Sequence, residues 1–231
     1  MGDPGCFPAA LRHTTVGVIA ELKRRSPSKG PLNEQLSAPV RAAEYVAGRA
    51  VAISVLTEPT RFSGSIDDLV SVRAAVAVPL LRKDFIVHQV QLLEAREAGA
   101  DAVLLIARAL APTRAADLAA HAAALGLAVL FEIRNESELV RGLDIPGCVI
   151  GVNARNLETL DVDPAVSERL IPLIPADRVA VFESGVRGRD DVERAARLGA
   201  DAVLVGSLLS MQPDGARAVT ALAGIPRVGR G

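Results

Sequence analysis

Eight short aliphatic runs, separated by Ala-, Leu- and Arg-rich stretches, constrain the fold most strongly. We expect buried strands there, because each run is short, rich in branched aliphatic residues and followed by polar residues. The runs are VGVIAE (from Val16), VAISVL (Val51), PLLRKD (Pro79), AVLLIA (Ala102), AVLFE (Ala128), CVIGVN (Cys148), VAVFE (Val179) and AVLVG (Ala202). The stretches between them have helical spacing, and those ending at Gly99, Gly126 and Gly199 predict left-handed helix C-caps.

Regular alternation of strand and helix predicts a parallel sheet with right-handed crossovers. Eight units in roughly 200 residues predict an α/β fold in which the sheet closes into a single (β/α)₈ TIM barrel. An open doubly wound sheet is the alternative, but no G-x-G-x-x-G follows the first strand. The phrase GADAVL occurs at Gly99–Leu104 and again at Gly199–Leu204. This repeat favours a barrel of two similar halves, although Gly-Ala-Asp is also a common helix-to-strand turn.

No Pro-, Gly- or Ser-rich linker divides the chain, so we expect one domain. Its predicted parts are a short N-terminal segment over residues 1–15, a barrel catalytic domain over 16–224 and a C-terminal tail over 225–231 that is loosely held.

Composition excludes several classes of protein. Half of the 231 residues are hydrophobic, which is enough for a large core, and the net charge of −1 gives no field that would attract nucleic acid or an anionic membrane. No secretory signal and no apolar run of about 18 residues is evident. Cys6 and Cys148 suggest neither a disulfide framework nor a metal site, so a reducing cytoplasm is the expected compartment.

Polar residues gather directly behind five of the predicted strands, where barrel enzymes carry their working groups. Residues two apart on a strand share a side, so Glu21 with Lys23, Lys83 with Phe85 and Asn153 with Arg155 form same-facing pairs. With Glu132 and Glu183, these groups are expected to converge and to shift one another's protonation. The alternative is that they are charged ends of buried strands that simply reach water.

Two Gly/Ser pairs follow the last two strands, Ser184-Gly185 and Gly206-Ser207. Small residues there let backbone N–H groups approach an anion, which predicts a phosphate site, although both pairs are also ordinary turn formers. The long loop from Lys23 to Pro39 is expected to be a lid or binding loop. Its basic residues Lys23, Arg24, Arg25 and Lys29 either meet an anionic substrate or are solvated.

Five segments in order along the chain resemble the indole-3-glycerol phosphate synthase family. They are IAELKRRSPSKG (Ile19–Gly30), AISVLTEPTRFSGSIDDL (Ala52–Leu69), LLRKDFIV (Leu80–Val87), IGVNARNLETLDVD (Ile150–Asp163) and ESGV with LVGSLL near the end. The resemblance implies a decarboxylating carbon–carbon lyase of tryptophan biosynthesis. Its substrate would be a phosphorylated small molecule, 1-(2-carboxyphenylamino)-1-deoxyribulose 5-phosphate, and no metal or organic cofactor would be needed.

The resemblance also implies a role for each matching residue. Lys83 would be the general acid, Glu132 the general base of the later dehydration, and Lys23 a contact to the substrate carboxylate that shares acid duty. Glu21, Asn153 and Glu183 would orient the substrate and the lysines, with Arg155 as a positioning cation. The phosphate would be held by Ser26, Ser184, Gly185, Gly206 and Ser207, and the anthranilate ring by Phe62, Phe85, Leu104 and Leu157.

The chain departs from the family pattern at two places. Only about fifteen residues precede Val16, whereas family members usually carry a longer segment with an extra helix over the barrel mouth. Weaker closure over the ring, or closure by another chain, is therefore expected. Arg134 stands two residues after Glu132, where the family more often has a smaller polar residue, so its charge is expected to affect that carboxylate.

Other functions fit the sequence less well. Phosphoribosylanthranilate isomerase shares the barrel and the phosphate motif but typically uses a Cys and an Asp, and the first strand here ends without Cys. A metal-dependent epimerase needs His ligands at strand ends, where none of the three His residues falls. A non-catalytic barrel that binds a metabolite or a partner is favoured only by the short N-terminus. We expect a monomer or weak association with other tryptophan-pathway enzymes.

Overall fold

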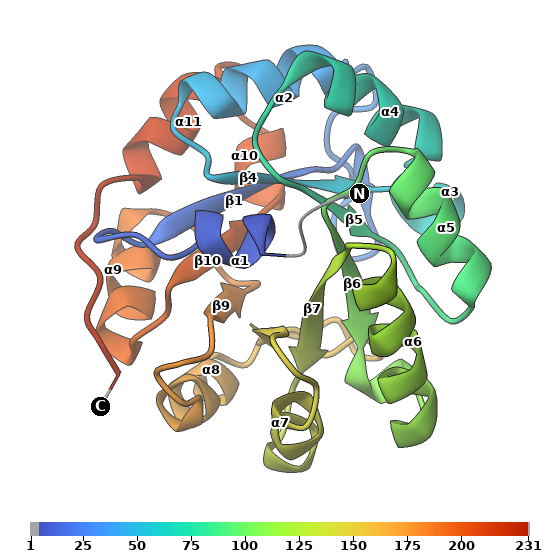
Figure 1. Cartoon of the computed structure of the whole chain (residues 1–231). Coiled ribbons are helices and arrows are strands. Elements are labelled where there is room, and N and C mark those ends of the chain that lie inside the picture. The colour runs from blue at the N-terminus through green and yellow to red at the C-terminus, as the bar shows by residue number, and fades with distance from the viewer. Residues whose placement is uncertain (1–4, 231) are drawn as a thin grey trace.

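The computed structural model describes residues 5–230 and contains a closed barrel of eight parallel strands surrounded by helices (Figure 1). The barrel strands follow one another in chain order round the ring. Their bounds are β1 (Gly17–Leu22), β4 (Ala52–Leu56), β5 (Leu80–Lys83), β6 (Ala102–Ile106), β7 (Ala128–Ile133), β8 (Val149–Asn153), β9 (Ala180–Glu183) and β10 (Ala202–Val205). The eight strands predicted from the sequence and the TIM barrel are thus confirmed.

One long helix follows each barrel strand, and shorter elements are added at both ends of the barrel. The outer helices are α2 (Ala38–Ala47), α4 (Ile66–Ala75), α5 (Gln89–Glu97), α6 (Pro112–Ala124), α7 (Glu136–Leu143), α8 (Pro164–Leu170), α9 (Arg189–Leu198) and α11 (Gly215–Leu222). The additional elements are α1 (Cys6–Ala10), the hairpin β2 (Arg25–Ser26) and β3 (Gly30–Pro31), α3 (Pro59–Phe62), η1 (Ala107–Ala109), η2 (Ile171–Leu173) and α10 (Ser207–Ser210). Gly99, Gly126 and Gly199 have the positive φ angles predicted for them.

Two layers of apolar packing follow from the alternation of side chains along the strands. In β1, Val18 and Ala20 pack against the outer helices, whereas Ile19 faces the barrel interior. Leu81, Leu130 and Val181 occupy the interior on other strands. Residues two positions further along these strands are directed into the same interior, at its C-terminal end.

The opposite, N-terminal end of the barrel is closed by helix α1, which crosses the centre of the strand ring (Figure 1). Phe7 and Leu11 are completely buried there in one apolar cluster with residues that begin a barrel strand, such as Ala128 of β7 and Ala202 of β10. The sequence predicts only a short N-terminal segment here. It does not predict a helix that closes the barrel, because a five-residue helix is too short for a recognisable hydrophobic period.

The C-terminal tail is fixed to the same end of the barrel, so the expectation of a loosely held tail is wrong for residues 225–230. Ile225 is buried, and its carbonyl oxygen accepts a hydrogen bond of 2.8 Å from the Val16 N–H. The buried Arg230 guanidinium forms an ion pair of 2.9 Å with Asp201 and donates to the carbonyl oxygens of Gly199, Arg178 and Ile174.

The two GADAVL copies have matching environments, which supports the hypothesis that the barrel consists of two similar halves. Asp101 pairs with Arg73 at 3.0 Å and accepts the Leu80 N–H at 2.9 Å. In the second copy, Asp201 pairs with Arg230 and accepts the Ala180 N–H at 2.8 Å. Each arginine stem also lies where a Cβ on Gly99 or Gly199 would overlap it, so glycine is required at both places. The C-terminal tail thus provides the arginine that α4 provides in the first half.

We expect Arg230→Ala to lower the free energy of unfolding by about 2 kcal/mol, because the buried Asp201 carboxylate loses one of its two arginine partners and keeps only Arg227. Urea denaturation measures this loss. Arg108→Ala is the control, since it removes a cation from an exposed pair with Glu158 and should cost less than about 1 kcal/mol. Equal urea midpoints for the two variants would contradict the tail's role.

Candidate active site

Four ionisable side chains form one layer inside the C-terminal end of the barrel. Glu21, Lys83, Glu132 and Glu183 come from β1, β5, β7 and β9, each two residues after an interior aliphatic residue. Alternate strands fill one layer of such a barrel, which is why these four meet. The three glutamates are at most 3% exposed. Charges buried this deeply must be paired or lose their charge by proton transfer.

Glu21 is the paired carboxylate of the layer. Its Oε1 lies 2.6 Å from Lys23 Nζ, and its Oε2 lies 3.4 Å from Lys83 Nζ. Burial alone would raise its pKa, but the two ammonium groups outweigh burial and lower the pKa of Glu21 to about 2. Glu21 is therefore ionised at neutral pH and holds both lysines at the cavity floor.

Lys83 is the central cation of the layer. Burial would lower its pKa, but the carboxylates of Glu21, Glu132 and Glu183 outweigh this and raise the pKa well above the usual lysine value. Burial also raises the pKa of Glu132, while the charge of Lys83 and a hydrogen bond with Asn153 oppose that shift. A charged ammonium thus lies close to a carboxyl group that readily takes up a proton, as general acid–base chemistry requires.

Glu183 is the least compensated acid of the layer. Its Oε1 is buried and has no hydrogen-bond partner in the described part of the chain. Burial and repulsion by Glu132 raise the pKa of Glu183 to about 8, although Lys83 partly opposes them. Gly151 on β8 makes room for this side chain, because a Cβ there would overlap Glu183 Oε1.

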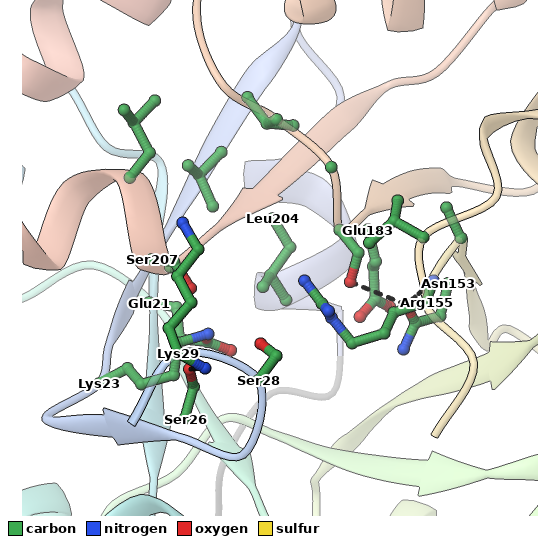
Figure 2. Close-up of a pocket in the computed structure, with 18 of the residues that line it drawn as sticks. Glu21, Lys23, Ser26, Ser28, Lys29, Asn153, Arg155, Glu183, Leu204 and Ser207 are labelled. Atoms are coloured by element: carbon green, nitrogen blue, oxygen red, sulfur yellow. Dashed lines mark hydrogen bonds and ion pairs between the residues drawn. The ribbon is translucent and has the colours of Figure 1, made fainter. Parts of the chain in front are cut away.

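A cavity of about 630 Å³ opens above this layer. Its lining includes Glu21, Lys23, Lys83 and Glu183. Figure 2 shows Glu183, Asn153 and Arg155 on one side of the cavity and Glu21 and Lys23 on the other. The apolar part of the wall includes Phe62 from α3 and Phe85, Leu157, Leu160 and Val162 from loops. A ligand in this cavity would contact cations, carboxyl groups and an apolar surface together.

The loop that carries Phe85 is held by buried polar contacts below it. Asp84 accepts hydrogen bonds from the Thr57 hydroxyl at 2.6 Å and from its neighbour's backbone, Phe85 N–H, at 2.8 Å. The buried Arg82 pairs with Asp84 at 3.1 Å and donates to the Gln91 carbonyl oxygen at 2.6 Å. These contacts fix the end of β5, which positions Lys83 and Phe85.

The two Gly/Ser pairs both line the cavity. Ser184 and Gly185 have left-handed backbones with φ of 66° and 80°, and the Ser184 hydroxyl donates to Asn153 Oδ1 at 2.8 Å. Gly206 must lack a side chain, since a Cβ there would overlap Glu21 Oε1. Ser207 begins α10 directly after it. Both turns therefore bring backbone close to the space above the floor.

Fourteen of the sixteen residues predicted for the site line the cavity, and Glu132 and Leu104 do not. Glu132 is buried next to Asn153 and Lys83, and Leu104 belongs to the interior apolar cluster. Ser26 does line it, through the hairpin β2–β3, together with Lys29. Of the other basic loop residues, Arg24 forms two hydrogen bonds with Asp68 at 2.6 and 2.7 Å, and Arg25 is exposed outside the lining.

Arg134 does not line the cavity. Its guanidinium donates to the backbone carbonyl oxygens of Asn153 at 3.1 Å and Ala154 at 3.4 Å, so it supports the end of β8. The pKa of Glu132 is shifted by burial and by four neighbouring groups, Lys83, Asn153, Glu138 and Glu21. The influence of Arg134 on this carboxylate remains a prediction.

Sequence reasoning missed Arg61, which lines the cavity from α3 with its guanidinium 5.8 Å from the centre of the Phe85 ring. It also missed Arg187, Arg194, Leu160 and Met211. Arg61 and Leu160 had a signal, since Arg61 directly precedes Phe62 and Leu160 lies in the segment Ile150–Asp163, both in stretches already singled out. The others come from loops and helix faces whose approach to the cavity depends on the folded structure.

Comparison with known sequences identifies the relationship. A model of indole-3-glycerol phosphate synthase matches residues 5–222. This chain belongs to that family. The protein named indole-3-glycerol phosphate synthase 1 from Streptomyces coelicolor is 53% identical over 214 residues, which are 93% of this chain and 80% of that protein. The indole-3-glycerol phosphate synthase of Nocardioides sp. is 51% identical over 208 residues, 90% of this chain and 80% of that one.

Solved structures with little sequence similarity share the barrel of this family member. The 3-hexulose-6-phosphate synthase of Salmonella typhimurium is 15% identical and superimposes with a TM-score of 0.72 over 90% of this chain and 96% of that chain. Thiamine phosphate pyrophosphorylase of Pyrococcus furiosus gives 0.66 at 14% identity, over 90% of this chain and 93% of the other. At this identity the likeness concerns the fold alone.

Residues 5–230 contain neither a metal-binding cluster nor a membrane-spanning helix. No three His, Cys, Asp or Glu side chains come together in a way that could hold a metal ion. No helix in the same range has the length and apolar character needed to cross a bilayer.

The raised pKa of Glu183 predicts a pH dependence of stability. Folded Glu183 keeps a proton up to about pH 8, whereas the unfolded chain releases it near 4.5. The stability contributed by this proton is full below pH 4.5 and is lost as the pH rises to 8. Relative to Glu183→Gln, the wild type should lose free energy of unfolding steadily over this window, on the order of 1 kcal/mol per pH unit. Urea denaturation at several pH values measures the difference, and a pH-independent difference would contradict a neutral Glu183.

Proposed function

We propose that this protein is an indole-3-glycerol phosphate synthase. It closes the indole ring of 1-(2-carboxyphenylamino)-1-deoxyribulose 5-phosphate, with loss of carbon dioxide and water. The observation that carries the proposal is the partly buried Lys83 ammonium, held by Glu21 at the floor of a cavity that also offers an apolar wall and two Gly/Ser turns. Membership of the family supports it. A carboxylated aromatic ring linked to a sugar phosphate calls for this combination of groups.

In the first half of the reaction, the ring carbon that bears the carboxylate attacks the sugar ketone carbon. Lys83 donates a proton to the ketone oxygen as it gains negative charge, and the new hydroxyl stays on the sugar carbon. The carboxylate then leaves as carbon dioxide, and its bonding electrons restore the aromatic ring. The raised pKa of Lys83 supports this role, because the proton is present over the whole neutral range.

In the second half, the new hydroxyl leaves as water and a proton is lost from the neighbouring carbon, which completes the indole. Glu132 accepts that proton as general base. Its burial supports this role, since a carboxylate with a raised pKa is a stronger proton acceptor. Glu132 acts from beneath Asn153, with which it shares a hydrogen bond. Lys23 shares acid duty with Lys83 through their common partner Glu21.

The remaining groups bind and orient the substrate. Lys23 contacts the ring carboxylate, Glu21, Asn153 and Glu183 orient the sugar hydroxyls and the lysines, and Arg155 positions the sugar. The backbone turns at Ser184-Gly185 and Gly206-Ser207, with Ser26, hold the phosphate. The anthranilate ring lies against Phe62, Phe85 and Leu157, with Leu104 in the apolar layer below.

The cell compartment and the associations of this protein are also part of the proposal. We infer that it acts in a reducing cytoplasm, because Cys148 is a buried cysteine outside any disulfide, whose thiol donates to the Gly142 carbonyl oxygen at 3.0 Å. It acts as a monomer or in weak association with other tryptophan-pathway enzymes.

Lys83→Ala should lower kcat at least about 100-fold, because the ketone oxygen then lacks its proton donor. The assay follows indole fluorescence on addition of the substrate, and circular dichroism checks that the variant is folded. Arg169→Ala is the control, since it removes a cation from an exposed pair with Glu136 on the outer helices. Turnover by Lys83→Ala at the rate of this control would overturn the assignment.

A further inference from the structure

Most cations of the cavity are already committed to partners within the protein. Lys23 and Lys83 bind Glu21. Arg155 donates to the Leu160 carbonyl oxygen at 2.6 Å, and the guanidinium groups of Arg187 and Arg194 pair with Asp191. In the described part of the chain, the remaining lining cations, Lys29 and Arg61, have side chains with no hydrogen bond or ion pair. The proposed substrate has two anionic groups, the phosphate and the ring carboxylate.

Lys29 lies on the phosphate side of the cavity. Lys29 and Ser207 both line the cavity, and Figure 2 draws them on the same side, with Arg155 on the opposite side. The Lys29 backbone N–H donates to Ser26 Oγ at 3.2 Å, a contact that closes the turn of the hairpin β2–β3. The Lys29 ammonium is therefore suited to the phosphate group held by the Gly/Ser turns. Arg61 is then the cation available to bind the other anionic group, the ring carboxylate.

The backbone under Arg61 is rigidly positioned. Glu58 caps α3 by accepting the N–H groups of Thr60 at 3.0 Å and Arg61 at 2.7 Å. Gly64 closes the turn with a hydrogen bond of 3.0 Å to the Glu58 carbonyl oxygen, and a Cβ there would overlap the end of β4 at the Leu56 carbonyl. A helical turn fixed at both ends thus presents a guanidinium with no polar partner to the cavity.

The apolar neighbours of Arg61 indicate which ligand group it meets. Its guanidinium lies over the ring of Phe85, and Phe62 follows it in the chain. Both rings line the slot proposed for the anthranilate ring. Lys23 and Phe62 also share a small crevice beside the main cavity, so Lys23 is close to the base of α3. An anion at the edge of a ring in this slot would lie between Arg61 and Lys23.

We propose that Arg61 binds the ring carboxylate of the substrate and thereby distinguishes substrate from product; this inference rests on the proposed function. Lys23 alone is a weak carboxylate ligand, because Glu21 already compensates its charge at 2.6 Å. A guanidinium is planar and can bind a carboxylate through two parallel hydrogen bonds. Loss of carbon dioxide removes this contact, so the product is held less tightly on the ring side and leaves more readily.

The test compares two unreactive ligands by titration calorimetry. One is the substrate with its ketone reduced to an alcohol, and the other is the same compound without the ring carboxylate. Arg61→Gln should weaken binding of the carboxylated ligand about 10-fold and of the other less than about 2-fold. With the natural substrate, the variant should raise KM about 10-fold and leave kcat within about 2-fold.

Arg187→Gln is the matched control, because it removes the same charge from the cavity rim next to the Ser184-Gly185 turn. It should change both affinities by the same factor. Equal losses of both ligands in Arg61→Gln, or the same selective loss in Arg187→Gln, would overturn the role of Arg61 and leave the proposed function standing. A wild-type protein that binds neither ligand would instead refute the proposed function, and the inference with it.

Discussion

The active site depends on one partly buried ammonium group. Lys83 lies at the cavity floor among Glu21, Glu132 and Glu183, three glutamates that are almost completely buried, where an unpaired charge would be strongly unfavourable. Lys23 is the second cation beside the layer and is bound to Glu21. Three acids thus share two cations. Burial raises the pKa of Glu132 and Glu183, and the two cations are too few to offset it, so the layer retains a proton at neutral pH. Proton transfer is thereby built into the electrostatics of the barrel interior.

Barrel geometry creates this layer, and glycines keep it open. Strand register brings Glu183 opposite Asn153 and places Glu132 opposite Gly151. Gly151 leaves space for the Glu183 carboxyl group, as Gly206 does for Glu21. An alanine at either position would occupy the volume of a carboxylate oxygen. The charges and the small residues therefore form one unit, although they come from six different strands or their ends.

Stability and chemistry are separated at opposite ends of the barrel. At the N-terminal end, Phe7 fills the interior and Arg230 joins the tail to Asp201. At the C-terminal end, the hairpin β2–β3 and the short helix α3 bring Lys29 and Arg61 over the cavity without using them in internal ion pairs. Both side chains are exposed to water, so the lack of an ion pair for them among the described residues costs little stability.

The sequence alone determined the eight strands, the closed barrel, the left-handed glycine caps and fourteen of the residues that line the cavity, because these follow from local periodicity and from which residues end a strand. The tertiary structure decided the rest. It placed Glu132 beneath the cavity, committed Arg24 to Asp68, directed Arg134 to the backbone at the end of β8 and tied down residues 225–230. Each of these outcomes depends on partners more than ten residues away in the chain, and no local pattern encodes a charge's choice among such partners.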